Sequence, residues 1–140
     1  MKYIDMHCDT LYQIYNAKRE GRTFCLRDTA SLLVNALKMK AGGYLLQNFA
    51  AFVDIEEAKE VLGGEDAPYR YAKELVRIFK DQIAANSDLI RPAASFAELQ
   101  ANQEAGVASA MLTLEEGGIC LGDIEKLREF YQDGARMMTL

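Results

Sequence analysis

The sequence predicts an α/β fold in which parallel strands alternate with helices. Two runs, residues 44–53 and 107–114, have the length of strands and are too apolar to be half-exposed, so we expect each to be buried on both faces. Segments between and after these runs place apolar residues at the spacing of an amphipathic helix. Buried strands that alternate with such helices are typical of a parallel sheet covered by helices.

The chain opens with an expected strand at residues 3–10, where Tyr3, Ile4 and Met6 are apolar. Thr10 has a side chain that can cap a helix, which we expect at residues 11–18. The N-terminus therefore enters the sheet at once.

A second helix is expected at residues 31–40. Leu33, Ala36 and Leu37 would form its apolar face, and the pair Gly42-Gly43 would end it. The apolar run that begins at residue 44 follows directly, so this helix leads into the second strand.

The later helices carry clear start signals. Asp54 and Ser95 are each followed three residues on by a glutamate, as at helix N-termini, and Pro68 stands near the start of the longest helix. The apolar positions of that longest helix are Ala72, Leu75, Val76, Phe79 and Ile83. We expect helices at residues 54–62, 66–85, 95–105 and 124–132, and a last strand at residues 135–140.

Composition excludes several functions. The 140 residues suit one domain, with half of them apolar, and the net charge of −5 argues against a nucleic-acid partner. No apolar run could cross a bilayer and no signal peptide is evident, so we expect no membrane association. Three cysteines without a CxxC pair indicate reduced thiols and a cytoplasmic location.

The first strand holds the sole histidine of the chain, His7. Alternate strand residues share a face, so Asp5, His7 and Asp9 would lie together. Imidazole nitrogen and carboxylate oxygen both ligate zinc, which makes His7 and Asp9 candidate metal ligands. The alternative is a histidine that is hydrogen-bonded within the core.

A second candidate ligand follows the strand at residues 107–114. Glu116 precedes two glycines, which allow a tight turn and a close approach of a ligand. Ligands gather at the C-terminal ends of parallel strands, where His7 and Asp9 are also expected, so Glu116 suits a bridging carboxylate of a two-metal centre. The alternative is that Glu115 and Glu116 are solvated at a loop corner.

Several motifs together resemble the membrane (renal) dipeptidase family, peptidase family M19, and its bacterial branch in particular. They are IDMHCDTL at residues 4–11, QNFAAFV at 47–53, LEEGG at 114–118 and LREFYQDGARMMTL at 127–140, with the glycines at 42–43. They occur in the family's order over essentially the whole chain. Members of the family continue well beyond the part that these residues match.

The resemblance implies an α/β fold, the N-terminal half of a TIM-like (β/α)8 barrel, with residues 1–140 forming a single partial domain. It implies a zinc-dependent dipeptidase in which a metal-bridging hydroxide attacks the peptide bond. By matching position, His7 and Asp9 would bind one zinc of a binuclear centre and Glu116 would bridge both. The remaining ligands and the substrate-binding residues lie in the part that is not matched, so no catalytic residue beyond the metal ligands is assigned.

Three readings of the function follow. The first is a cytoplasmic metallo-dipeptidase acting on dipeptides, of which this chain is the N-terminal portion, with at most a partial zinc site and no useful hydrolysis alone. The second is a non-catalytic assembly or binding module, because an incomplete barrel exposes strand edges that could take up a C-terminal half or a second copy. The third is another amidohydrolase-type metal hydrolase, although Asp9 stands where that superfamily usually has a second histidine.

Five polar or sulfur-bearing residues remain outside these assignments. We expect Asp5 to form hydrogen bonds within the core, with a role as a metal ligand as the alternative. We expect Cys8 to be a buried apolar contact on the opposite face from His7, and Arg136 to lie in a surface or inter-strand ion pair. Gln47 and Asn48 stand mid-strand, where an inward-facing amide could hydrogen-bond near the metals.

Overall fold

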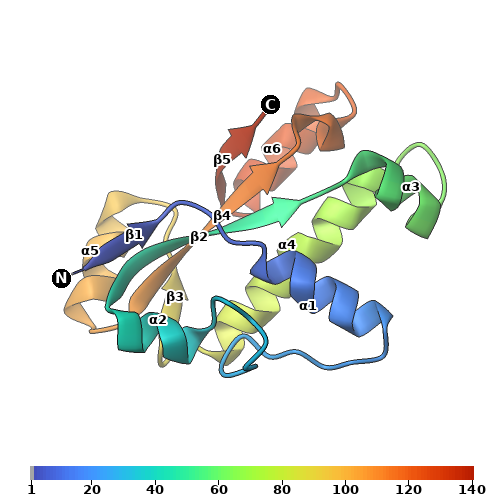
Figure 1. The fold of residues 1–140 in the computed structure, drawn as a ribbon. Coiled ribbons are helices and arrows are strands. Elements are labelled where there is room, and N and C mark those ends of the chain that lie inside the picture. Colours follow the sequence, from blue (N-terminus) through green and yellow to red (C-terminus); the bar gives the residue numbers. More distant parts are fainter. Residues whose placement is uncertain (1) are drawn as a thin grey trace.

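A computed structural model describes residues 2–140 and shows one parallel five-stranded sheet with helices packed against it (Figure 1). The strands are β1 (Tyr3–Asp5), β2 (Tyr44–Phe52), β3 (Ile90–Pro92), β4 (Ala108–Glu115) and β5 (Ala135–Thr139). The helices are α1 (Thr10–Arg19), α2 (Ala36–Gly42), α3 (Ile55–Leu62), α4 (Ala67–Ala85), α5 (Phe96–Glu104) and α6 (Ile124–Gln132), with a 3₁₀ turn η1 (Gly117–Cys120).

The sheet is built around β2 and β4, which pair over seven residue positions from Leu46↔Ser109 to Phe52↔Glu115. β1 lies on the free side of β2, and β3 and β5 share the far edge of β4. Omitting β3 leaves the sequential order β1-β2-β4-β5, which is the strand order of half an eight-stranded barrel. The sequence did not predict β3, because its three residues end in a proline and are too few for a strand pattern.

Helix starts follow the capping signals closely. The Asp54 carboxylate accepts a hydrogen bond from the Glu57 backbone N–H at 2.9 Å and caps α3. Ser95 accepts from the Glu98 N–H at the start of α5, and the Glu98 carboxylate accepts in turn from the Ser95 hydroxyl. These contacts are local in sequence, which explains why both caps could be predicted.

Two predictions near the N-terminus were wrong in detail. The first strand ends at Asp5, and Thr10 is the first residue of α1, so Asp9 rather than Thr10 holds the N-cap position. The second helix begins only at Ala36, because the Asn35 side chain caps it by accepting from the Lys38 N–H.

This late start changes the buried face of α2. Ala36 and Met39 are buried, whereas Leu33 lies before the helix with 83% of its surface exposed and Leu37 is exposed as well. The predicted stop is confirmed: Gly43 ends α2 with a φ of 71°, a left-handed conformation that favours glycine.

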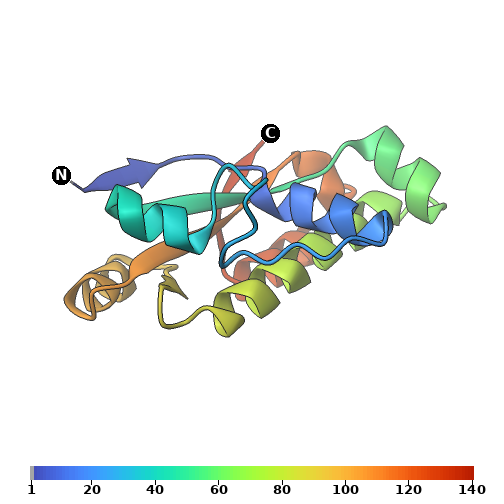
Figure 2. The ribbon, with the colours of Figure 1, turned by 60° about the horizontal axis from the view of Figure 1, so that its bottom comes forward.

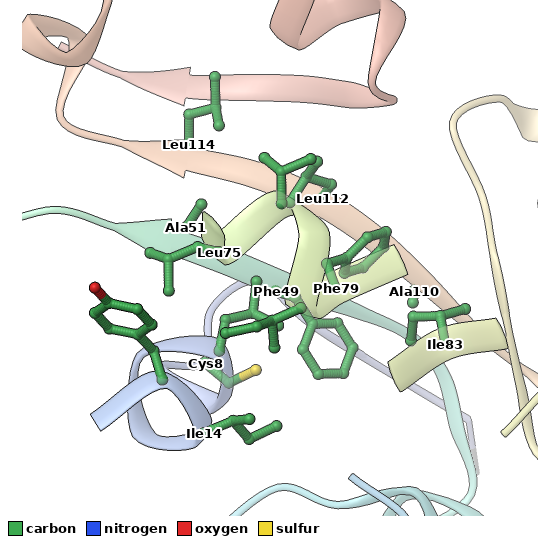
Figure 3. Packing of buried hydrophobic residues seen from close by; sticks show 14 of the residues in the cluster. Cys8, Ile14, Phe49, Ala51, Leu75, Phe79, Ile83, Ala110, Leu112 and Leu114 are labelled. Carbon is green, nitrogen blue, oxygen red and sulfur yellow. The ribbon is translucent and has the colours of Figure 1, made fainter. Parts of the chain in front are cut away.

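The core lies between one face of the sheet and the helices α1 and α4, which run side by side (Figures 1 and 2). Figure 3 shows Phe49 of β2 and Leu112 of β4 meeting Leu75 and Phe79 of α4. All five apolar positions predicted for α4 are buried. The opposite face of the sheet carries the alternate residues of β2 and β4, among them Phe52 and Glu115.

Within residues 2–140 no strand pairs with the outer edge of β1 or of β5. Apolar side chains are exposed near both edges: Ile4 and Met6 near β1, and Met137 and Leu140 near β5. An unpaired strand edge leaves backbone N–H and C=O groups available to pair with a further strand. In the same part of the chain, no helix combines the length and the apolar character that crossing a bilayer requires.

Candidate metal centre

His7, Asp9 and Glu115 meet at the C-terminal ends of the parallel strands. The His7 Nε2 atom lies 3.0 Å from Asp9 Oδ1 and 3.5 Å from Glu115 Oε2. One donor atom from each residue falls within 4.8 Å of the other two. The three side chains are between one-third and one-half exposed, which leaves the cluster open to solvent on one side.

The backbone between β1 and α1 holds the first two members in place. The Cys8 side chain is buried in the core, and its backbone carbonyl accepts a hydrogen bond from the Ala50 N–H at 3.1 Å. The Asp5 carboxylate accepts from the His7 N–H at 3.1 Å. Because Cys8 is anchored on the helix side, its neighbours His7 and Asp9 project away from the core.

Glu115 is the last residue of β4 and lies in register with Phe52, the last residue of β2. Its Oε2 atom is buried and has no hydrogen-bond partner, and His7 Nε2 lies at ion-pair distance from it. Such an oxygen is costly to bury without a partner. An imidazole nitrogen and two carboxylates around one point are a donor set that suits zinc or another first-row divalent ion. The residues present therefore fit a metal.

Glu116, the predicted bridging ligand, lies outside this cluster. Its Oε1 atom accepts a hydrogen bond from the Gly118 N–H at 2.7 Å and caps η1. Glu116 has a positive φ of 103°, uncommon for a residue with a side chain. A Cβ atom at Gly118 would lie 2.8 Å from that Oε1, so the cap depends on glycine there. β4 ends at Glu115, and Glu116 leaves the strand with its positive φ, so the structure places Glu115, not Glu116, beside His7.

A hollow of about 420 Å³ opens beside the cluster and is lined by His7, Asp9, Tyr12, Gln13, Phe52 and Glu115. Sequence reasoning missed Tyr12, Phe52 and Glu115 as members of this site. The only sequence signal for Tyr12 was its place in the first turn of the helix that follows His7 and Asp9. Phe52 and Glu115 become neighbours through the register of two strands far apart in sequence.

The remaining residues behave mostly as structural groups. Burial raises the pKa of the Cys8 thiol to about 11, as suits a buried apolar contact. The Arg136 guanidinium donates to the backbone carbonyls of Ala94 and Tyr131 rather than to a carboxylate, so the predicted ion pair is absent from its contacts. Gln47 and Asn48 are fully buried, and each side-chain carbonyl oxygen is without a partner.

Comparison with known proteins places this geometry in context. The family model of the membrane dipeptidases, peptidase family M19, matches residues 1–140. The chain belongs to this family. No curated protein matches the sequence.

Solved structures share the fold at low sequence identity. A metallopeptidase from Rhodobacter sphaeroides, liganded with a phosphinate mimic of the dipeptide L-Ala-D-Ala, is 18% identical with a TM-score of 0.82 and aligns over 99% of this chain and 44% of its own. A dipeptidase described as a metallopeptidase of family M19 is 19% identical with a TM-score of 0.78, over 99% of this chain and 42% of its own. An amidohydrolase from Pseudomonas aeruginosa is 19% identical with a TM-score of 0.61, over 73% of this chain and 28% of its own.

The match of the family model confirms the predicted family, and the likeness to solved structures confirms the predicted fold class. The parallel α/β arrangement corresponds to part of a TIM-like barrel, and the chain spans less than half the length of the structures it matches. Membership of a metallopeptidase family implies the use of a metal, and the His7 cluster is a group of residues that could hold one.

Proposed function

We propose that this chain is the metal-binding portion of a zinc-dependent dipeptidase. One observation carries the proposal: His7 and Asp9, which follow β1, and Glu115, which ends β4, are far apart in sequence and converge at the C-terminal ends of the strands. Ligand sites of parallel α/β folds lie there. The similar structure that is named a dipeptidase, and the similar metallopeptidase that is bound to a dipeptide mimic, support a dipeptide as the substrate.

The side chains have distinct roles in this proposal. A zinc ion bound here would polarise the substrate carbonyl and make hydroxide available near neutral pH. His7 would hold the ion through its neutral imidazole, and Asp9, whose Oδ1 lies 3.0 Å from His7 Nε2, would be a second ligand. Glu115 would be the third, through its unpartnered Oε2 atom. Asp5 supports the site by fixing the backbone of His7.

The chain holds one histidine, and residues 2–140, which the structure describes, offer one cluster of three ligands and not two complete metal sites. We therefore propose that the chain binds about one zinc weakly and does not hydrolyse dipeptides at a useful rate by itself. The remaining ligands of a binuclear centre would come from residues that correspond to the part of the family's longer chains that this chain does not match.

Two measurements test the proposal. Zinc stoichiometry of the purified chain is measured after titration and removal of free metal, with His7→Ala as the control. About one zinc that is lost in His7→Ala supports the site, whereas equal binding by both proteins overturns it. The chain is then co-expressed with the unmatched portion of a family member, and hydrolysis of simple dipeptides is assayed. A purified complex that binds zinc but cleaves no dipeptide would overturn the enzymatic proposal.

The open edges favour a second candidate, a non-catalytic assembly module. Exposed Ile4 and Met137 stand at opposite ends of one parallel sheet, where β1 and β5 could each accept a further strand. Light scattering after size exclusion tests this candidate, because a monomer at all concentrations would contradict self-association. The three free thiols also lead us to propose a cytoplasmic location, which fractionation with an antibody to the chain would test.

A further inference from the structure

The hollow beside His7 has a lining of two chemical kinds. It combines the three residues of the metal-ligand cluster and Gln13 with two aromatic residues, Tyr12 and Phe52. The two rings meet edge to face, with centroids 5.5 Å apart and planes at 78°. This arrangement is favourable for aromatic pairs and presents apolar surface to the hollow.

A hydrogen bond from α3 fixes the Tyr12 ring. The Tyr12 hydroxyl donates to Glu57 Oε2 at 2.8 Å, and the other oxygen of Glu57 accepts from Arg19 at 2.8 Å. Glu57 is in the first turn of α3, which Asp54 caps, and α3 begins three residues after Phe52. The connection between β2 and α3 therefore holds both rings, Phe52 directly and Tyr12 through Glu57.

We propose that Glu57 is a positioning residue for substrate selection, and that Tyr12 and Phe52 bind an apolar, preferably aromatic, side chain of the dipeptide. The inference rests on the proposed function, because it assumes that the reacting carbonyl lies at the His7 cluster. A ligand anchored there projects its neighbouring side chain into the same hollow of about 420 Å³. The Glu57 bond prevents the Tyr12 ring from turning away and widening the hollow.

The contacts of Glu57 also explain why its own role is indirect. Glu57 does not line the hollow; it contacts the substrate side only through the Tyr12 hydroxyl. Its loss should therefore alter which side chain is accepted rather than whether metal is bound. Glu56 supplies a matched control, because it is the preceding residue of the same helix, is exposed, and pairs only with Lys59 at 3.4 Å.

The test measures binding of three dipeptides, glycylglycine, phenylalanylglycine and glycylphenylalanine, to the zinc-loaded chain by calorimetry. We expect at least one phenylalanine dipeptide to bind tenfold or more tightly than glycylglycine. Tyr12→Phe and Glu57→Ala should lower that ratio at least threefold with zinc stoichiometry unchanged. Glu57→Gln, which keeps an acceptor for the hydroxyl, should retain most of the ratio, and Glu56→Gln all of it.

Each outcome of this experiment tests a different part of the proposal. Equal affinity for all three dipeptides, or no binding of any of them, by a chain that retains its His7-dependent zinc would overturn the aromatic subsite and leave the metal site standing. An unchanged ratio in both Tyr12→Phe and Glu57→Ala would overturn the positioning role alone. Loss of zinc binding by the unsubstituted chain would instead count against the proposed function. Thermal unfolding of each variant shows whether a lost ratio comes from misfolding.

Discussion

The choice between Glu115 and Glu116 as the metal ligand can be decided by two isosteric substitutions. Glu115→Gln removes the charge from an oxygen that is buried and unpartnered beside His7. Glu116→Gln keeps an amide oxygen that can still accept from the Gly118 N–H, so its cap on η1 survives. We expect the first substitution, and not the second, to weaken zinc binding.

The size of the effect follows from linkage between binding and folding. Free zinc at one hundred times its dissociation constant stabilises the folded chain by about 2.7 kcal/mol. In a domain of roughly this length each kcal/mol raises the midpoint of thermal unfolding by about 2–4 °C, so zinc should raise it by about 8 °C. A loss of about a hundredfold in affinity, which even supporting contacts of metal ligands can cause, would reduce that rise to about 1 °C.

The assay is thermal unfolding followed by circular dichroism, at one fixed free-zinc concentration and in chelator. The chain and Glu116→Gln should show the full zinc-dependent rise, and Glu115→Gln almost none. All three proteins should unfold at similar temperatures in chelator. A full rise in Glu115→Gln together with none in Glu116→Gln would refute the geometric argument and restore Glu116 as the ligand.

Three further substitutions test how the fold is held together. Leu75→Ala empties a fully buried site on α4, so it should lower the free energy of unfolding in urea by about 2–5 kcal/mol; a loss below about 1 kcal/mol would contradict this packing. The pKa of the Glu74 carboxyl is lowered from 4.5 to about 2 by a hydrogen bond from Arg77, opposed in part by burial, and by a second hydrogen bond from Lys18. The stabilisation of the fold by these bonds is therefore complete above pH 4.5 and is lost as the pH falls towards 2. Because these groups are partly exposed, Glu74→Gln should lower the free energy of unfolding by about 1 kcal/mol at pH 7, and this difference from the unsubstituted chain should shrink below pH 4.5. Urea titrations over a pH series measure it, and a difference that stays constant with pH would rule the ion pair out. Gly43→Ala places a side chain at a φ of 71° and should lower stability by about 1 kcal/mol, measured in the same way, whereas a neutral result would contradict the left-handed end of α2.

The sequence alone determined the features that depend on near neighbours. The caps at Asp54 and Ser95 are contacts between residues three apart, and the apolar spacing of α4 marks its buried face before any partner is known. The order of buried strands and amphipathic helices was enough to predict a parallel sheet, because few other arrangements bury both kinds of surface. The pairing of His7 with Asp9 was also local.

The wrong start of α2 and the unpredicted β3 show which features could not be predicted from neighbouring residues alone. Asn35 caps α2 from a position that gives no stronger signal than Ser31, so the start of the helix depended on packing of the preceding loop. β3 is short and gains its pairing from β4, which comes later in the chain. Neither element is specified by its own residues.

Tertiary structure alone decided the composition of the site. β4 ends at Glu115, so which of the two glutamates faces His7 depended on the pairing of β2 with β4, in which Phe52 faces Glu115. Because Glu115 and Glu116 are the same residue type, the sequence cannot show which register the end of β4 adopts, and only the packed sheet shows which carboxylate meets His7. The sequence therefore determined that a carboxylate would stand at the end of β4, and the register of the sheet determined which one.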